Sequence, residues 1–155
     1  MGVELSPKMQ EFTQEVYPAI IGTTRKDGSV EMVPVWFEFK DGSFWINGGT
    51  NRGWFKHLQR DPRISLLLID PKTMWRWAQV LGRMVNWAED PGGEHINHLS
   101  HRYMGRDYQN PRTGRIKIQI EPLRVMGSID DGGWRAFVPL TQSFIMACDG
   151  SLVDE

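Results

Sequence analysis

The sequence predicts a mainly β protein, built as an antiparallel barrel of six strands with a few short helices. Three observations favour this fold class: short runs of β-branched and aromatic residues, Asp-Gly turns that join several of these runs, and glycines inside them. The sequence lacks the repeated alternation of strand and helix that a parallel sheet requires. With 155 residues, 40% of them hydrophobic, the chain fits a single domain over residues 1–155.

The N-terminal half is expected to form one helix and a three-stranded meander. The helix should cover residues 6–15, because Ser6 provides a capping hydroxyl and Pro7 suits the first helical turn. Runs rich in β-branched and aromatic residues predict the three strands, which should cover residues 19–25, 30–39 and 43–47. Asp-Gly turns join the first strand to the second and the second to the third, which is a strong hairpin signal.

The second half is expected to mix strands with two further helices. The predicted elements are a helix over 54–60, strands over 64–70 and 75–89, a helix over 93–105 and a strand over 116–121. Gly82 lies inside the longest strand and predicts a bulge or a bend, and Gly105 should close the last helix. Pro122 should end the final strand, with residues 123–129 returning beside it. The tail over 130–155 gives no clear pattern.

Composition and charge exclude several classes of function. The chain carries 18 Lys and Arg against 19 Asp and Glu, so it lacks the basic field that draws a protein onto nucleic acid or anionic lipid. No apolar run approaches the roughly 20 residues of a membrane span, and the acidic N-terminal segment is unlike a signal peptide. The lone Cys148 fits a reducing compartment. We therefore expect a cytoplasmic protein that acts on a small molecule, without a nucleic-acid or membrane partner.

The segment from Asn47 to Lys56 is the most informative candidate site. Its small residues let backbone N–H groups approach an anion, and the helix that follows adds the partial positive charge of its N-terminus. Arg52 and Lys56 stand four residues apart and share one helix face. The segment therefore predicts a phosphate pocket. A plain strand-to-helix turn with solvated cations is the alternative, and the spacing fits neither the Walker nor the dinucleotide-binding glycine pattern.

Several motifs, taken in order, resemble the pyridoxamine 5′-phosphate oxidase-like superfamily and, within it, the flavin/deazaflavin-dependent oxidoreductases. The motifs are the Lys26–Ser29 turn, Val33–Phe37, Asn47–Lys56, Leu58–Leu66, Gly82-Arg83 and His98–Gly105. The resemblance covers about residues 20–125. It implies a six-stranded split β-barrel that forms a homodimer, with two equivalent cofactor sites in clefts between the subunits.

The resemblance also implies which residues hold the cofactor. The strand around 32–36 should lie along the tricyclic ring, and the segment 47–56 should hold the ribityl chain and the phosphate. The cofactor-binding residues expected from one subunit are Met32, Val33, Pro34, Val35, Asn47, Gly48, Thr50, Asn51, Arg52, Gly53 and Lys56. The partner subunit is expected to supply Arg76, Trp77 and Gln79.

The same motifs look most like the deazaflavin-using branch, so the resemblance implies coenzyme F-420 as first choice and FMN as second. The activity implied is hydride transfer to a small conjugated acceptor. The substrate-binding arginine pattern of the oxidase itself is not matched, although Trp134-Arg135 lies in that region. An FMN-binding oxidase-like protein and a non-catalytic cofactor carrier remain as alternatives, and no catalytic residue stands out.

Three histidines, His95, His98 and His101, lie at successive spacings of three residues. This pattern suggests a metal site, but it is not the spacing of four used by helical zinc proteases, and three such positions drift around the helix. We expect solvated or hydrogen-bonded histidines and no metal.

Overall fold

The computed structural model of the chain describes residues 2–129. The C-terminal tail 130–155, including Trp134, Arg135 and Cys148, lies outside the described residues. The helices are α1 (Pro7–Gln14), α2 (Gly53–Arg60) and α3 (Glu94–Met104). The strands are β1 (Ala19–Thr24), β2 (Val30–Val35), β3 (Phe37–Lys40), β4 (Ser43–Gly49), β5 (Arg63–Ile69), β6 (Trp77–Glu89) and β7 (Arg115–Gly127).

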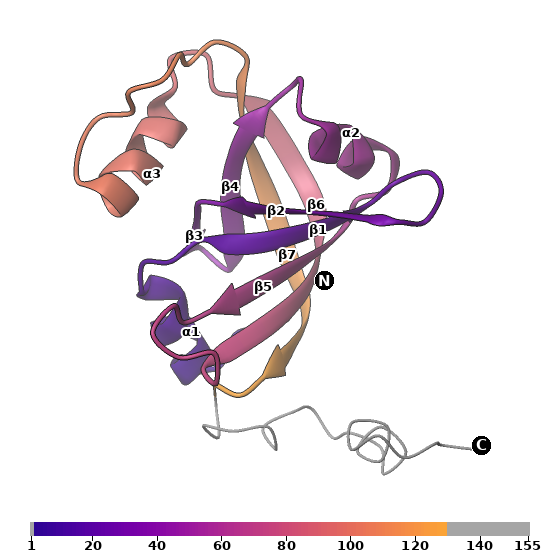
Figure 1. The fold of residues 1–155 in the computed structure, drawn as a ribbon, viewed down its shortest axis with the longest axis vertical. Helices are drawn as coiled ribbons and strands as arrows, with labels where there is room; N and C mark the ends of the chain where they lie inside the picture. Colours follow the sequence, from indigo (N-terminus) through magenta and orange to yellow (C-terminus); the bar gives the residue numbers. More distant parts are fainter. Residues whose placement is uncertain (1, 130–155) are drawn as a thin grey trace.

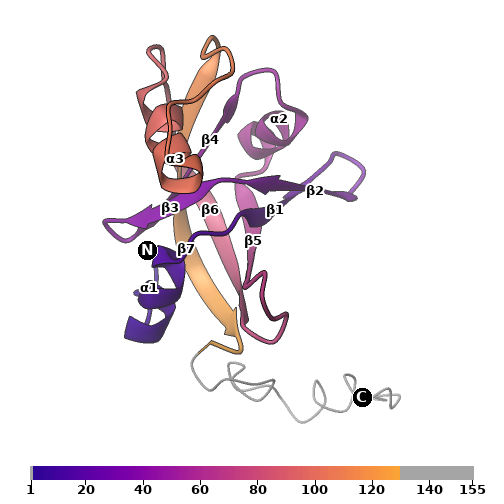
Figure 2. The ribbon, with the colours of Figure 1, turned by 60° about the vertical axis from the view of Figure 1, so that its left-hand side comes forward.

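The strands form one antiparallel sheet in the order β2-β1-β5-β6-β7-β4-β3 (Figure 1). Strands β2 and β3 occupy opposite edges of this sheet, yet only Trp36 separates them in the chain. The sheet therefore curls until its two edges come together at one residue. Figure 2 shows β2 and β3 on opposite sides of this junction. The predicted split barrel is confirmed.

The predicted strand over 30–39 is in fact two strands, so the described part of the chain has seven strands where the sequence predicted six. The reason is Trp36, which leaves the sheet and stacks its indole on the ring of Tyr103, with ring centroids 5.2 Å apart and 10° between the planes. The Tyr103 hydroxyl accepts a hydrogen bond from Phe37 N (3.1 Å) and donates one to Tyr17 O (2.7 Å). The predicted meander is therefore replaced by two separate hairpins, β1–β2 and β3–β4.

Strand β7 runs through Pro122, so the prediction that this proline ends the strand is wrong. A shift of register between Leu81 and Gly82 places Pro122 opposite Gly82, where the ladder is already interrupted. A Cβ on Gly82 would lie 2.8 Å from Ile120 Cγ2, so the close approach of β6 and β7 requires glycine there. The predicted bulge at Gly82 is confirmed.

The helix boundaries follow the local signals that predicted them. In α1, Ser6 Oγ accepts from Met9 N (3.2 Å), as expected of an N-cap. Helix α3 lies between Gly93 and Gly105, whose φ angles of 65° and 67° favour glycine, and Gly105 ends the helix as predicted.

The core fills the barrel with the inward-facing side chains of the strands and the apolar faces of α1 and α2. Helices α2 and α3 lie at one end of the barrel, on either side of β4, while α1 lies at the opposite end (Figures 1 and 2). None of the helices in residues 2–129 is long and apolar enough to cross a membrane. The end that carries α2 and α3 is where most of the site residues predicted for one subunit converge.

Candidate functional site

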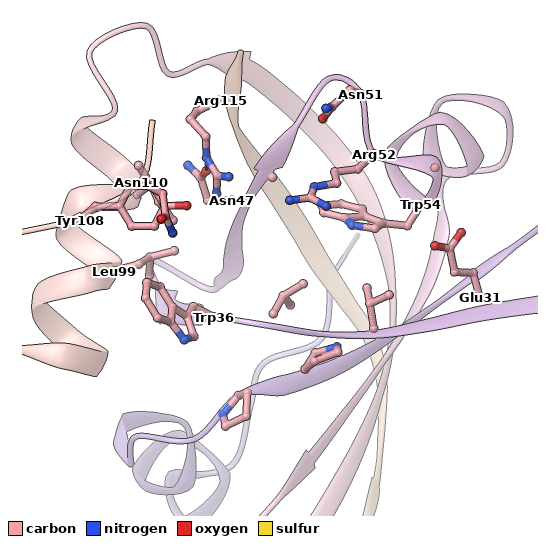
Figure 3. Close-up of a pocket in the computed structure, with 17 residues that line it drawn as sticks. Glu31, Trp36, Asn47, Asn51, Arg52, Trp54, Leu99, Tyr108, Asn110 and Arg115 are labelled. Carbon is pink, nitrogen blue, oxygen red and sulfur yellow. Dashed lines mark hydrogen bonds between the residues drawn. The ribbon is translucent and has the colours of Figure 1, made fainter. Parts of the chain in front are cut away.

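A cleft of about 770 Å³ lies between α2 and α3 (Figure 3). Eight of the eleven site residues predicted for one subunit line it: Val33, Pro34, Val35, Asn47, Gly48, Asn51, Arg52 and Gly53. The other lining residues are Pro18, Glu31, Trp36, Trp54, Ile96, Leu99, Tyr108, Asn110 and Arg115. The cleft therefore brings together β2, the end of β4, the start of α2, α3 and the start of β7.

Two arginine side chains extend into the cleft from different sides (Figure 3). Arg52 is the N-cap of α2, and Arg115 is the first residue of β7. In residues 2–129, neither guanidinium forms an ion pair with a carboxylate. Burial lowers the pKa of Arg115, and the neighbouring charge of Arg52 lowers it further. Arginine stays charged at any physiological pH, so this end of the cleft concentrates positive charge.

The Arg115 guanidinium is held by a buried network around Asn47. Arg115 Nε donates to Asn47 Oδ1 (2.8 Å), and Asn47 Nδ2 donates to Asp90 Oδ2 (3.1 Å). The same Nδ2 lies 3.1 Å from His95 Nδ1. Only one orientation of the amide satisfies these neighbours, because arginine only donates and an ionised carboxylate only accepts. His95 Nδ1 therefore accepts.

Asp90 connects this network to the start of α3. Its carboxylate accepts from the backbone N–H groups of His95 and Ile96, each at 3.1 Å. Burial alone would raise the pKa of Asp90, but these hydrogen bonds and the one from Asn47 hold it below its ordinary value. Asp90 is therefore ionised at neutral pH and fixes α3 relative to β4.

The glycines at this end of the cleft make room for the protein's own side chains. A Cβ on Gly48 would lie 2.6 Å from two atoms of the Trp54 indole, and a Cβ on Gly53 would lie 3.3 Å from Glu31 Oε2. Trp54 and Glu31 in turn line the cleft. Glu31 also contacts His57, with 3.3 Å between Oε2 and Nδ1, which brings one carboxylate to the cationic end.

The opposite wall of the cleft is apolar and aromatic. Trp36 stacks on Tyr103 and meets Tyr108 edge-on, with 6.4 Å between the ring centroids of Trp36 and Tyr108. Val33 and Val35 of β2 continue this wall along the strand. A flat ring system fits such a surface, because planar apolar side chains bury its face.

Three predicted residues of the same subunit do not line the cleft. Met32 points to the other face of β2 and is 64% exposed. Thr50 lies exposed in the turn after β4, and Lys56 lies exposed one turn into α2.

The residues predicted to come from the partner subunit lie far from the cleft of their own chain. Trp77 and Gln79 are at the start of β6, whereas Glu89 at its end lies beside α3. The twelve intervening steps correspond to roughly 40 Å of strand. Arg76 precedes this strand and forms ion pairs with two carboxylates of its own chain. One chain therefore does not bring these three residues to its own cleft.

Sequence reasoning missed two residues that shape the cleft, Asp90 and Arg115, and it placed Trp36 on the ring-binding strand without counting it among the cofactor-binding residues. Asp90 stands just before the predicted helix over 93–105, where a carboxylate that accepts from the helix N-terminus is common. Arg115 stands directly before the alternating strand over 116–121, on the polar side of the alternation. Both signals are present in the sequence. The sequence does not show, however, that Asp90 and Arg115 meet around Asn47.

The three histidines of α3 contact polar side chains, as the hydrogen-bonded interpretation expected, and His95 and His98 share the carboxylate of Glu38. His95 contacts Asn47, whereas His98 Nε2 lies 2.6 Å from Glu38 Oε2 and His101 Nε2 lies 2.6 Å from Asp107 Oδ1. In the part of the chain that the structure describes, no group of three or more His, Cys, Asp or Glu side chains is arranged to hold a metal ion.

Glu38 is expected to make the stability of the protein depend on pH. Burial alone would raise its pKa, but hydrogen bonds with His95 and His98 lower the pKa of Glu38 from 4.5 to about 2. Because the folded value lies below the unfolded one, its stabilisation is complete above pH 4.5 and is lost as the pH falls towards 2. Glu38→Gln should lower the free energy of unfolding at pH 7 by about 1–3 kcal/mol, and the difference should vanish near pH 2.

Urea denaturation of both proteins between pH 7 and pH 2 measures this effect. Glu11→Gln, at an exposed position of α1, is the matched control and should follow the parent at every pH. A constant difference between parent and Glu38→Gln across this range would contradict the assignment.

Comparison with known proteins identifies the family and the fold of this chain. The sequence family described as pyridoxamine 5′-phosphate oxidase matches residues 5–127. A solved structure described as an F420 reductase shares 22% identity and a TM-score of 0.70, covering 75% of this chain and 94% of that one. No curated protein matches the chain.

Two further solved structures have the same fold. A conserved hypothetical protein from Mycobacterium tuberculosis shares 23% identity, with a TM-score of 0.62, over 80% of this chain and 84% of that one. General stress protein 26 from Bacillus anthracis shares 16% identity, with a TM-score of 0.59, over 77% of this chain and 89% of that one. At these identities the structures show the fold alone, whereas the family match spans most of the chain. The chain therefore belongs to the pyridoxamine 5′-phosphate oxidase family.

Proposed function

We propose that this protein is an oxidoreductase that binds F-420, with FMN as the second candidate, and transfers hydride to a small conjugated acceptor. The observation that carries the proposal is the cleft, in which two arginines without ion-paired carboxylates lie beside an apolar and aromatic wall. Both cofactors join a flat ring to a phosphate through a ribityl chain. Family membership and the likeness to an F420 reductase support the proposal.

The elements of the cleft suit the parts of such a cofactor. Val33, Val35 and Trp36 offer a surface for the ring. Asn51 and Arg52 lie where α2 begins, and the N-cap makes no side-chain hydrogen bond to the first turn. The backbone N–H groups of that turn and the helix dipole therefore favour an anion at this end.

We extend the proposal to a homodimer in which the partner completes the cleft. The partner's Arg76, the partner's Trp77 and the partner's Gln79 would contribute to it. Trp77 and Gln79 alternate with the buried Ala78, so they face outward from the barrel. Met74 and Trp75, 65% and 57% exposed beside them, add apolar surface that an interface would cover.

Charge on α2 favours F-420 over FMN. Arg52, Lys56 and Arg60 stand at successive spacings of four residues and share one exposed face of the helix. Such a row of cations continues away from the phosphate end and suits the carboxylates of the F-420 tail, which FMN lacks. The partner's Lys72 would add to it. Glu31 opposes this field, although His57 and Arg25 lie beside it.

The chemistry rests on the cofactor, and the chain's own part is positioning. When bound in the cleft, the reduced cofactor would supply the hydride for an activated double bond or quinone, and a proton from solvent or a side chain would complete the reduction. In the described residues no histidine lines the cleft, and its one carboxylate, Glu31, lies at the cationic end. Holding ring and acceptor together and excluding water carries much of such a reaction, so we assign no catalytic residue.

Fluorescence titration of the purified protein with F-420 and FMN tests the proposal, together with light scattering. F-420 should bind several-fold more tightly at low salt, with the advantage shrinking as salt is raised, and the mass should be twice 17.9 kDa. FMN binding that equals or exceeds F-420 binding would move the protein to the flavin branch. Binding without turnover would indicate a cofactor carrier, and binding of neither compound would exclude the proposal.

Arg52→Ala should weaken cofactor binding by about 1.5–3 kcal/mol, or roughly ten- to a hundred-fold, because it removes a charge-assisted hydrogen bond to phosphate. Arg52→Lys should restore only part of the lost affinity, since an ammonium lacks the planar guanidinium fork that binds two phosphate oxygens. Lys56→Ala should weaken F-420 binding by about two- to fivefold, because Lys56 is exposed and lies outside the cleft lining. Melting temperatures should barely change, because both side chains are exposed. Unchanged affinity in Arg52→Ala would remove this residue from the site.

A further inference from the structure

Among residues 2–129, Arg115 forms its one side-chain hydrogen bond through Nε and leaves its terminal nitrogens available. Arg115 Nε donates to Asn47, and the guanidinium lies over the Tyr108 ring, 5.4 Å from its centroid. Within residues 2–129, neither Nη atom has a hydrogen-bond acceptor. A half-buried guanidinium with unused donors in a cleft is arranged to receive an anion, because its charge is already partly desolvated.

Arg52 faces the same space from α2 (Figure 3). Two like charges repel, so holding Arg52 near Arg115 costs free energy unless an anion lies between them. Asp90 also acts on Arg115, but its oxygens already accept from Asn47 and from the first turn of α3. Glu31 lies beside His57 and Gly53 at the start of α2. Neither carboxylate forms an ion pair with Arg115.

Asn47, by contrast, has no donor left for a ligand. It is buried, and its Nδ2 faces Asp90 and His95 while its Oδ1 accepts from Arg115. The resemblance to known proteins suggested a direct contact between Asn47 and the cofactor. Asn47 lines the cleft, yet the protein's own groups occupy its side-chain amide, which can therefore act on a ligand by way of the Arg115 side chain.

We propose that Arg115 is a second ligand of the cofactor phosphate, opposite Arg52, and that Asn47 is a positioning residue that acts through Arg115. This inference rests on the proposed function. It adds a phosphate ligand from β7, on the far side of the cleft from α2, and it replaces a direct role of Asn47 with an indirect one.

Ligand pairs that differ in their phosphate isolate this role. FMN differs from riboflavin only by its phosphate, and F-420 can be compared with the deazaflavin that ends at the ribityl hydroxyl. Arg115→Met should weaken FMN binding by about ten- to a hundred-fold and leave riboflavin binding within about twofold. Inorganic phosphate should compete with FMN on the parent protein and lose this effect on Arg115→Met.

Lys40→Met is the matched control. Lys40 is exposed and pairs with Ser43 at the start of β4, six residues and roughly 20 Å from the end of β4 that pairs with Arg115, so its removal changes the net charge equally without touching the cleft. It should leave the affinities for both ligands unchanged. Arg115→Lys keeps the charge and should show an intermediate loss for FMN, which covers the case in which Arg115→Met does not fold.

A double-mutant cycle tests the indirect role of Asn47. Asn47→Ser should weaken FMN binding in the parent protein and have little further effect once Arg115 is methionine, because the two residues act as one unit. Additive losses would show that Asn47 acts by itself.

The outcomes separate this inference from the function on which it rests. Equal losses for FMN and riboflavin, or none, would overturn the role of Arg115, while flavin binding by the parent protein would leave the proposed function intact. A parent protein that binds no flavin or deazaflavin would overturn both.

Discussion

Asp90→Ala is expected to lower the free energy of unfolding by about 3 kcal/mol, because three buried donors lose their acceptor together. The backbone N–H groups of His95 and Ile96 would lose the cap of α3, and the Asn47 amide would lose its charged partner. An unsatisfied buried polar group costs about 1–3 kcal/mol and a lost cap about 1 kcal/mol. Water that hydrogen-bonds to some of these donors reduces the total loss. Urea denaturation at pH 7 measures this loss.

Asp107→Ala is the matched control for Asp90→Ala. Asp107 also accepts two side-chain hydrogen bonds, from His101 and Asn97, but it is exposed. Water replaces such bonds readily, so the control should lose less than about 1 kcal/mol. Equal losses in the two variants would show that the buried network around Asp90 adds no more to the free energy of unfolding than exposed hydrogen bonds do.

Tyr103→Phe is expected to lower the free energy of unfolding by about 2–3 kcal/mol. The hydroxyl joins the backbone on both sides of the barrel seam, accepting from Phe37 N and donating to Tyr17 O. Burial raises the pKa of Tyr103, so the proton stays in place at any physiological pH. Its removal would leave one backbone donor and one acceptor without this partner. Chemical denaturation monitored by tryptophan fluorescence measures the change.

Tyr108→Phe provides the comparison, because the Tyr108 hydroxyl has no hydrogen-bond partner among residues 2–129. It should change stability by less than about 0.5 kcal/mol. The ring of Tyr103 remains stacked on Trp36 in the phenylalanine variant, so cofactor affinity well below the melting temperature should change little. A stability loss no larger than that of Tyr108→Phe would contradict the role given to the Tyr103 hydroxyl.

The features that the sequence predicted well depend on residues a few positions apart. In the turn over 26–29, Asp27 Oδ1 accepts from Ser29 N (2.9 Å) and Ser29 Oγ (2.6 Å), and Gly28 adopts a φ of 88°. The caps at Ser6 and Gly105 are local in the same way. Such geometry follows from the conformational preferences of single residues, so no tertiary contact is needed to predict it.

The features that escaped prediction depend on contacts between distant segments. Trp36 breaks its strand because Tyr103, 67 positions later in the sequence, offers a ring and a hydroxyl there. Asn47 and Arg115 meet across 68 positions. Periodicity reports which face of an element is buried, but it does not report which distant side chain lies opposite. The cleft was therefore predictable from the residues of β2 and α2, and not from those of β7 or the start of α3.

Trp36 is the single residue between the two edge strands, and it also forms part of the cleft wall. A ligand that packs against its indole therefore binds the folded barrel and not the unfolded chain. By mass action, such a ligand adds RT ln(1 + [L]/Kd) to the free energy of unfolding, about 2.7 kcal/mol at a hundredfold excess over Kd. The fraction of molecules that stay folded is thus tied, through one side chain, to the ligand concentration around them.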